Sequence, residues 1–413
     1  MLLYIDPGTG SMLFTVLIGV LGAAFYAVRM LVIKLRYKLS GGKADTSMKK
    51  EPYVIFSDDK RYWKVFEPIC REMEKRGKEV LYITASPDDP ALKCEYKGFK
   101  AECIEEKNKL FTKLNYLNAG VLLSTTPGLD VYQWKRSKDV MHYVHIPHSA
   151  GGITMYRMFG LDYYDAVLYS GDFQADDIRA LEKLRNLPAK ELVEAGIPYM
   201  DEMAKALAEA EPIGEHERTV LLAPTWGPSA LFSVSGGKII EHLLKTGYHI
   251  IVRPHPQSFT SEKEMLDKLM AEYPESDQLE WNSDTDNFNV LHRADILVSD
   301  FSGVFYEFAF VHNKPIIYTD TNFDLSVYDA WWLKDSPLWV YSALPRIGRK
   351  LTQENMSNIK ELIDECLTDE RYSEGRQAAK NETWANPGKG AEIVADYLIS
   401  KYEELSSGTE GEK

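Results

Sequence analysis

Residues 296–303 read ILVSDFSG and predict a buried strand that ends in a small polar turn. A helical pattern follows at 304–311, and the apolar segment 314–318 predicts another strand. The backbone N–H groups of such a turn are free and the helix dipole adds partial positive charge, so the turn suits a phosphate. In a doubly wound parallel sheet this turn also marks the edge where ligands bind. The alternative interpretation is that Ser302 only caps the helix.

Strand and helix patterns alternate along most of the chain, which predicts parallel sheets covered by helices on both faces. Further strand patterns occur at 53–56, 80–84, 121–123, 143–146, 166–169, 219–223 and 248–252. Pro212 and Gly214 interrupt the alternation after a helix. We therefore expect the α/β class, with two Rossmann-like doubly wound domains at 51–210 and 211–405 and a flexible tail at 406–413. Two such domains in tandem predict a ligand-binding cleft between them.

The composition excludes some classes of protein. A chain of 413 residues with 45% hydrophobic content supports two or three domains with sizeable cores. The formal net charge of −14 argues against a nucleic-acid-binding protein, which needs a basic surface. The four cysteines show no metal-ligand spacing and predict reduced thiols in a cytosolic domain. Because no HExxH, EF-hand or Walker A pattern occurs, we expect neither a metal site nor a cofactor.

An apolar run near the N-terminus predicts a membrane anchor at 1–39, followed by a polar linker at 40–50. Residues 12–33 reach the roughly 20 residues that span a bilayer if Arg29 snorkels to the interface. Lys and Arg residues follow the run and none precedes it, so the C-terminal side should be cytoplasmic. We expect a single-pass protein of the cell membrane with a cytoplasmic catalytic domain. A buried globular helix is the alternative.

Three more polar clusters follow predicted strands: APTW at 223–226, RPHP at 253–256 and HIPHSAGG at 145–152. Because the carboxyl ends of parallel strands face the ligand crevice, we expect these clusters to meet. Arg253 and His255 alternate on an extended stretch, so both side chains can face one ligand. Arginine suits phosphate oxygens, and histidine can donate to a leaving oxygen. A structural arginine–carboxylate pair with a capping histidine is the alternative.

His148 stands before the small residues of 149–152 and is the candidate general base, because histidine titrates near neutral pH. In a continuing strand His145 would face the opposite side, so we assign it to packing or orientation. Two buried core histidines are the alternative.

Several segments occur in the order used by one family, namely the histidine segment, Gly171, EAGIPYMD at 194–201, APTW, RPHP and SDFSG at 299–303. In these segments the chain resembles the CDP-glycerol glycerophosphotransferases, which prime and polymerise teichoic acids. The resemblance runs from about residue 142 to about residue 318. It implies a two-domain glycosyltransferase-B-like fold, with an acceptor-side domain at 51–210 and a nucleotide-donor domain at 211–405. It also implies transfer of glycerol phosphate, or a similar polyol phosphate, from a CDP-linked donor to a hydroxyl of a lipid-linked or polymeric envelope acceptor, with release of CMP.

The resemblance implies roles for individual residues. His148 would be the general base and His255 a second catalytic group. The donor and its phosphates would be held by the remaining matches, which are Thr225, Arg253, Ser299, Asp300, Ser302, Gly303 and Glu307. Two departures concern acceptor and donor identity: Pro147 to Ala150 stand where the family has Trp-His-Gly-Thr, and Gly303 and Glu307 replace a Ser and an Asp.

Two other functions fit the same sequence. A glycosyltransferase of envelope polysaccharide synthesis that uses a UDP-sugar would share the fold and the phosphate-binding turn. A non-catalytic, membrane-tethered nucleotide-binding protein is compatible with the altered loop at His148. The retained Arg253 and His255 argue against the second of these.

Overall fold

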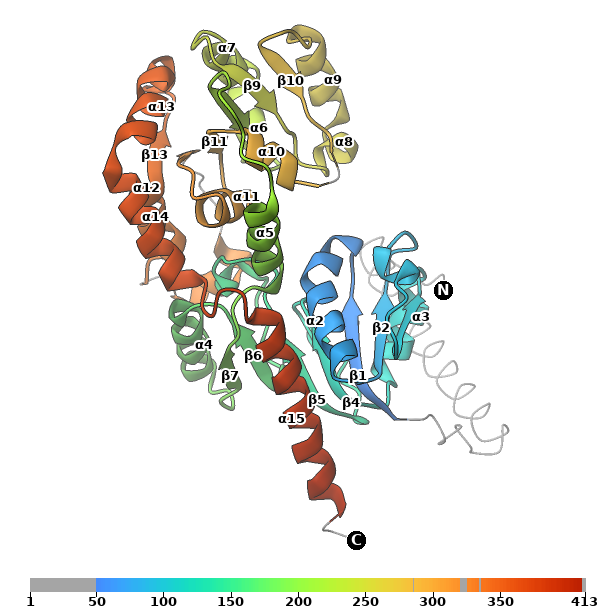
Figure 1. Cartoon of the computed structure of the whole chain (residues 1–413). Helices are drawn as coiled ribbons and strands as arrows, with labels where there is room; N and C mark the ends of the chain where they lie inside the picture. Colours follow the sequence, from blue (N-terminus) through green and yellow to red (C-terminus); the bar gives the residue numbers. More distant parts are fainter. Residues whose placement is uncertain (1–49, 285, 320–324, 334–335, 411–413) are drawn as a thin grey trace, which may run out of the picture. The chain divides into compact units, whose positions relative to one another are not determined.

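The computed structural model describes residues 50–284, 286–319, 325–333 and 336–410 (Figure 1). Contacts divide the chain into a unit at 1–50 and a compact unit at 51–413, and the architecture below is that of the second unit. The predicted membrane anchor and nearly all of the linker lie outside the described residues and stay predictions. Within the described part of the chain, no helix is both long and apolar enough to cross a bilayer.

The first half of the compact unit contains a seven-stranded parallel sheet in the order β3-β2-β1-β4-β5-β6-β7. Its strands are β1 (Glu51–Ser57), β2 (Val80–Thr84), β3 (Phe99–Cys103), β4 (Ala119–Ser124), β5 (Val140–His145), β6 (Ala166–Tyr169) and β7 (Glu191–Glu194). All neighbouring strands pair in parallel. β2 and β4 are buried along their whole length, as expected for a sheet covered by helices on both faces.

Alternate residues of these strands supply two separate cores. On β1, Tyr53 and Ile55 belong to one hydrophobic cluster, whereas Val54 and Phe56 belong to the other. The covering helices are α2 (Trp63–Lys75), α3 (Lys107–Asn115), α4 (Asp172–Arg185) and α5 (Pro198–Glu209), with short 3₁₀ turns η1 (Lys60–Tyr62), η2 (Pro90–Lys93) and η3 (Ile153–Met155). α2 and α3 pack on opposite faces, because their buried residues fall in different clusters.

The second half contains a six-stranded parallel sheet in the order β10-β9-β8-β11-β12-β13. Its strands are β8 (Thr219–Leu222), β9 (His249–Val252), β10 (Leu279–Trp281), β11 (Ile296–Ser299), β12 (Ile316–Thr319) and β13 (Gly348–Leu351). Its α-helices are α6 (Leu231–Ser235), α7 (Lys238–Leu244), α8 (Ser258–Ser261), α9 (Lys263–Glu272), α10 (Phe288–Arg293), α11 (Val304–Tyr306), α12 (Trp339–Ile347), α13 (Ile359–Thr368) and α14 (Glu370–Thr383). The prediction of two parallel α/β sheets is therefore confirmed.

Short helical turns complete the second half, namely η4 (Glu307–Val311), η5 (Leu325–Val327), η6 (Asp329–Leu333) and η7 (Met356–Asn358). The helix expected at 304–311 is present, but only its first turn is α-helical. From Glu307 it continues as the π-helical turn η4. The polar turn at 299–303 thus leads into a short, irregular helix.

The C-terminal end differs from the expectation in two ways. Helix α15 (Gly390–Glu410) contacts α2, β1 and β4, so it packs on the first sheet although we placed residues up to 405 in the second domain (Figure 1). α15 also extends to Glu410, whereas we expected a flexible tail from residue 406. The domain boundary near residue 210 remains a prediction.

Candidate active site

Three loops of the first half meet at the carboxyl ends of their strands. Asp58 follows β1, Thr126 follows β4 and His148 follows β5. Thr126 Oγ1 donates to Asp58 Oδ1 at 2.8 Å, and the rings of Tyr62 and His148 lie 4.9 Å apart. Asp58 is exposed to solvent, yet surrounding protein raises the pKa of its carboxyl group. A group that solvent reaches but neighbours partly desolvate is typical of a concave site.

His148 is held as a neutral base. Its ring is half-buried between Tyr62 and Tyr156, and its buried Nδ1 has no hydrogen-bond partner among the described residues. Burial, with help from the charges of Lys64 and Arg61, lowers the pKa of His148 to about 4. At neutral pH the ring is therefore unprotonated and able to accept a proton.

His145 is fully buried and its ring packs edge-on against Tyr156 and Tyr164. Its Nε2 lies 3.2 Å from Tyr156 Oη, and burial lowers its pKa to about 3. Because Tyr156 also contacts His148, His145 supports the wall of the site. This agrees with the predicted packing or orienting role.

The small-residue loop after His148 is fixed by contacts from other elements. Gln174 Nε2 donates to the Gly151 carbonyl at 2.6 Å, and Thr383 Oγ1 donates to the Ala150 carbonyl. A Cβ added at Gly151 would lie 2.8 Å from the hydroxyl of the buried Tyr306. Glycine is needed here because the second half of the unit approaches this backbone closely.

On the second sheet, Ser299 and Asp300 are buried and bonded within the chain. Ser299 Oγ donates to the Ala223 carbonyl at 2.7 Å. The Asp300 carboxylate accepts from the backbone N–H groups of Thr225 and Leu231, both at 2.9 Å. The two side chains thus hold the loop 223–231 beside the polar turn. They position that loop, at whose surface the Thr225 side chain is half-buried.

The rest of the turn lies opposite the first sheet. Ser302 Oγ accepts a long 3.5 Å contact from the Val304 N–H, which is the helix-capping alternative in a weak form. The nearest atom to a Cβ built at Gly303 is Ser149 Oγ, 4.0 Å away. The turn at 302–303 and the loop after His148 therefore approach each other closely, with small residues on both sides.

Arg253 is bonded within its own chain, although not to the carboxylate that the structural alternative expects. Its buried guanidinium donates to the Asn282 and Asn287 side-chain oxygens and to the backbone carbonyls of Asp284 and Asp286. These bonds hold the loop between β10 and α10. Arg253 shapes the site by fixing that loop, and its charge is directed to groups of its own chain.

His255 keeps an outward donor. Its Nδ1 accepts from the Gln257 N–H at 3.1 Å, so the neutral ring carries its proton on Nε2. The half-exposed Trp226 ring lies 6.4 Å away. Burial and the charge of Arg61 lower the pKa of His255, while Glu262 opposes this shift. Arg61 lies on η1 in the first half, so its positive charge acts on histidines of both halves.

Glu307 links the two halves beside the site. Its buried carboxylate pairs with Lys64 Nζ of α2 at 3.0 Å and accepts from Asn287 Nδ2 at 3.1 Å. Lys64 also lies 4.6 Å from the centroid of the Tyr199 ring. Since Asn287 is held by Arg253, Glu307 completes a continuous polar network from α2 to the loop after β10.

Sequence reasoning missed the segment 58–64, which contributes Asp58, Arg61, Tyr62 and Lys64. The acidic pair after β1 stood where a strand ends and could have identified it. Nothing in the sequence placed these residues beside His148, because the contact depends on the order of β1, β4 and β5 in the sheet.

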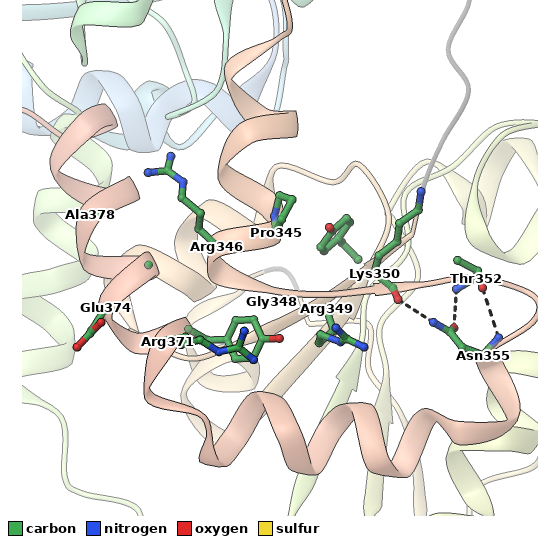
Figure 2. Close-up of a pocket in the computed structure, with 13 residues that line it drawn as sticks. Pro345, Arg346, Gly348, Arg349, Lys350, Thr352, Asn355, Arg371, Glu374 and Ala378 are labelled. Atoms are coloured by element: carbon green, nitrogen blue, oxygen red, sulfur yellow. Dashed lines mark hydrogen bonds between the residues drawn. The ribbon is translucent and has the colours of Figure 1, made fainter.

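A separate hollow of about 720 Å³ runs along β13, an edge strand of the second sheet, and contains none of the predicted site residues (Figure 2). Its basic residues are Arg346, Arg349, Lys350 and Arg371. The three arginines are paired, Arg346 with Glu382, Arg371 with Asp369, and Arg349 with Glu365. Charged side chains of this kind keep an edge strand from pairing with other chains.

Across the ranges described above, no group of three or more His, Cys, Asp or Glu side chains is placed to hold a metal ion.

The two comparisons of sequence agree on one family. A family model described as CDP-Glycerol:Poly(glycerophosphate) glycerophosphotransferase matches residues 161–397, more than half of the chain. The teichoic acid glycerol-phosphate primase of Bacillus subtilis (strain 168) is 28% identical over 191 residues. That match covers 44% of this chain and 46% of the primase, so the chain spans about half the length of this curated relative.

Solved structures match over nearly the whole chain. A structure of the wall teichoic acid polymerase TagF has a TM-score of 0.54 and 14% identity, with 92% of this chain and 97% of that chain covered. MnaA of S. aureus with UDP has a TM-score of 0.58 and 12% identity, with 86% and 97% covered. At these identities the likeness shows the fold alone, namely two parallel-sheet α/β domains of the glycosyltransferase-B type.

Proposed function

The chain belongs to the CDP-glycerol:poly(glycerophosphate) glycerophosphotransferase family, and we propose that it transfers glycerol phosphate from a CDP-linked donor to a hydroxyl group. The acceptor is a lipid-linked or polymeric molecule of the cell envelope, and CMP is the leaving product. The match to a teichoic acid glycerol-phosphate primase and the fold shared with a teichoic acid polymerase support this choice.

One observation carries the proposal. The unprotonated His148 stands at the end of β5, and the next residue, Ser149, lies opposite the turn 302–303 of the other sheet. A base and a phosphate-binding turn on facing strand ends are what transfer between a bound donor and a bound hydroxyl requires. His255 adds an Nε2–H donor from the donor-side sheet.

The reaction is a single in-line displacement at the donor phosphorus nearer to glycerol. The acceptor oxygen forms a bond to phosphorus while His148 takes its proton. The bond from phosphorus to the CMP oxygen breaks, and the electron pair leaves with CMP. His255 donates to the departing oxygens, and the backbone N–H groups at Ser302 and Gly303 neutralise charge on the transferred phosphoryl group. Thr225 contributes a hydroxyl at the same side.

Membrane attachment is part of the proposal. The apolar run within residues 1–39 would anchor the chain as a single-pass protein of the cell membrane, with the catalytic unit in the cytoplasm. An anchored enzyme would meet a lipid-linked acceptor at the membrane surface. No metal or cofactor is invoked for the transfer.

The test uses the full-length chain in detergent with an envelope lipid and polymer extract as acceptor. CDP-glycerol, other CDP-polyols and UDP-sugars are supplied separately, and released nucleotide is quantified. We expect CMP from CDP-glycerol, a loss of about 10² to 10⁴-fold in His148→Ala, and wild-type turnover in the control His216→Ala. His216 contacts Asp295 and lies outside the site.

Two results would contradict the proposal. UDP release without CMP release would identify a sugar-nucleotide glycosyltransferase on the same fold. Nucleotide binding without release of either product, in every acceptor fraction, would identify a non-catalytic binding protein.

A further inference from the structure

We propose that Arg61, on the one-turn helix η1 after β1, binds the phosphoryl oxygens of a nucleoside diphosphate held between His148 and His255. The proposal rests on the proposed function for the identity of that ligand. It adds a phosphate-binding cation from the first sheet, at a position that lies outside the range of the family match. The same chemistry would serve free pyrophosphate, which provides an independent probe.

The guanidinium of Arg61 is held in one orientation. Asp59 Oδ1 accepts from the backbone N–H and from Nε of Arg61, both at 2.9 Å, and Asp59 Oδ2 accepts from Nη2 at 3.1 Å. Nη1 has no such partner within the described residues. The side chain is 56% exposed, so this free edge can reach a ligand. A guanidinium fixed on one side by a carboxylate keeps its remaining donors available for a second oxyanion.

Arg61 stands where the two halves of the site meet. The next residue, Tyr62, packs its ring 4.9 Å from that of His148. On the other sheet, the positive charge of Arg61 also acts on His255 and lowers its pKa. The groups that act on His148 are Arg61 and Lys64, and those that act on His255 are Arg61 and Glu262. Arg61 is the cation common to both histidines.

The neighbouring cations are already engaged. Arg253 donates to four acceptors of the loop after β10. Lys64 pairs with the buried carboxylate of Glu307. A nucleoside diphosphate carries at least two negative charges, and backbone N–H groups of a short turn neutralise only part of them. Arg61 is itself paired with Asp59, but its side chain is exposed and its Nη1 has no partner among the described residues, so it can still add a cationic donor from the first half.

A structural role for the Arg61–Asp59 pair makes a different prediction. Exposed ion pairs contribute little to stability, so removing Arg61 as a structural residue would change the stability of the fold little. Removing it as a ligand would weaken anion binding while leaving the fold intact. The neighbouring Lys60 offers a matched control, because it is also exposed, also on η1 and paired with Asp88.

The experiment measures binding of CDP and of inorganic pyrophosphate to the full-length chain by calorimetry, in wild type, Arg61→Ala, Arg61→Lys and Lys60→Ala. We expect Arg61→Ala to weaken both ligands about tenfold or more, Arg61→Lys to weaken them less, and Lys60→Ala to leave them within about twofold. In NMR titrations, Arg61→Ala should raise the pKa of both His148 and His255, since a nearby positive charge is lost. Lys60→Ala should move neither.

The outcomes separate this inference from the proposed function. Unchanged CDP and pyrophosphate affinity in Arg61→Ala overturns the inference, even if wild type turns over CDP-glycerol. Absence of binding of both ligands to the wild type also overturns it. If pyrophosphate binding depends on Arg61 while CDP-glycerol is not consumed, the inference stands and the proposed function fails.

Discussion

The polar residues of the candidate site differ in whether other residues of the chain satisfy their hydrogen-bonding groups. Ser299, Asp300 and Arg253 are buried and have partners in neighbouring loops. His148 has a buried Nδ1 that lacks a partner among the described residues, and His255 keeps Nε2 available. Residue type predicted all five as site residues, but the sequence does not reveal which hydrogen bonds are made within the chain. The two histidines are therefore the groups best placed for chemistry.

The low pKa of His148 predicts an unusual pH profile. With a pKa near 4, His148 is unprotonated at neutral pH and stays so down to about pH 5. We expect kcat/KM to show no loss from this group between pH 8 and about 5, and to fall below that as His148 gains a proton. Lys64 and Arg61 are the charges that lower its pKa, so Arg61→Ala should shift the acid limb to higher pH. The assignment of a low pKa to His148 would be contradicted if kcat/KM of the wild type fell below about pH 6.5 and His148→Gln removed that fall.

Arg253 gives a prediction on stability. Arg253→Ala removes the donor of four hydrogen bonds to the loop after β10, so we expect the free energy of unfolding to fall by about 2–4 kcal/mol. Arg253→Lys should rescue little, because one ammonium cannot reproduce the planar fork. Denaturant unfolding of the full-length chain measures both. If Arg253→Ala left the midpoint of denaturant unfolding unchanged but lost donor binding, Arg253 would instead be a direct phosphate ligand.

At the scale of elements, interior strands were predictable and edge strands were not. Sequence patterns located β1, β2, β4, β5 and β6 of the first sheet, and β8, β9, β11 and β12 of the second. The four edge strands, β3, β7, β10 and β13, escaped detection because they are partly exposed. An apolar run signals burial on both faces, which an edge strand lacks.

The candidate site shows the same limit. The clusters after β5, β8, β9 and β11 were recognisable, because each follows a buried strand. The segment 58–64 was not, since its proximity to His148 follows from strand order rather than from local pattern. The π-helical turn η4, which carries Glu307, could not be predicted either, because the sequence pattern shows helical spacing but not the type of helix.

Two glycines on facing loops should respond differently to alanine. At Gly151 a new Cβ would lie 2.8 Å from the buried Tyr306 hydroxyl, so Gly151→Ala should lower the free energy of unfolding by about 1–3 kcal/mol. At Gly303 the nearest atom is 4.0 Å away and φ is −61°, so Gly303→Ala should stay within about 0.5 kcal/mol of wild type. Thermal unfolding of both variants checks this. Equal destabilisation would mean that the two loops do not approach as described.

At the scale of the whole compact unit, the C-terminal segment returns to the first half. Thr383 at the end of α14 donates to Ala150, and α15 packs against α2 and β4. Asp201 of α5 fixes the connection, because its carboxylate accepts from Trp384 Nε1 and from the N–H groups of Gly388 and Gly390 at 2.8–2.9 Å. The carboxylate also lies at the start of α15, where negative charge is favourable.

Replacing Asp201 should therefore loosen α15 first. Asp201→Ala leaves three donors without their acceptor, and we expect a loss of about 2–4 kcal/mol in the free energy of unfolding. Hydrogen exchange should accelerate in α15 and α2 more than in β8 to β13. Uniform acceleration over both sheets would instead indicate that α15 opens only with the entire unit.

The return of α15 has a consequence for cutting the chain. Residues 211–217 are mostly exposed, and they look like an interdomain linker that a protease would cleave. The two pieces from a nick there would stay associated through non-covalent packing, because residues 384–389 join the second half to α15, and α15 packs on the first half. A fragment of residues 51–210 would instead lack α15 and expose the apolar surface of α2 and β4 that it covers. The first sheet is thus completed by the last helix of the chain, and its independent expression requires that helix.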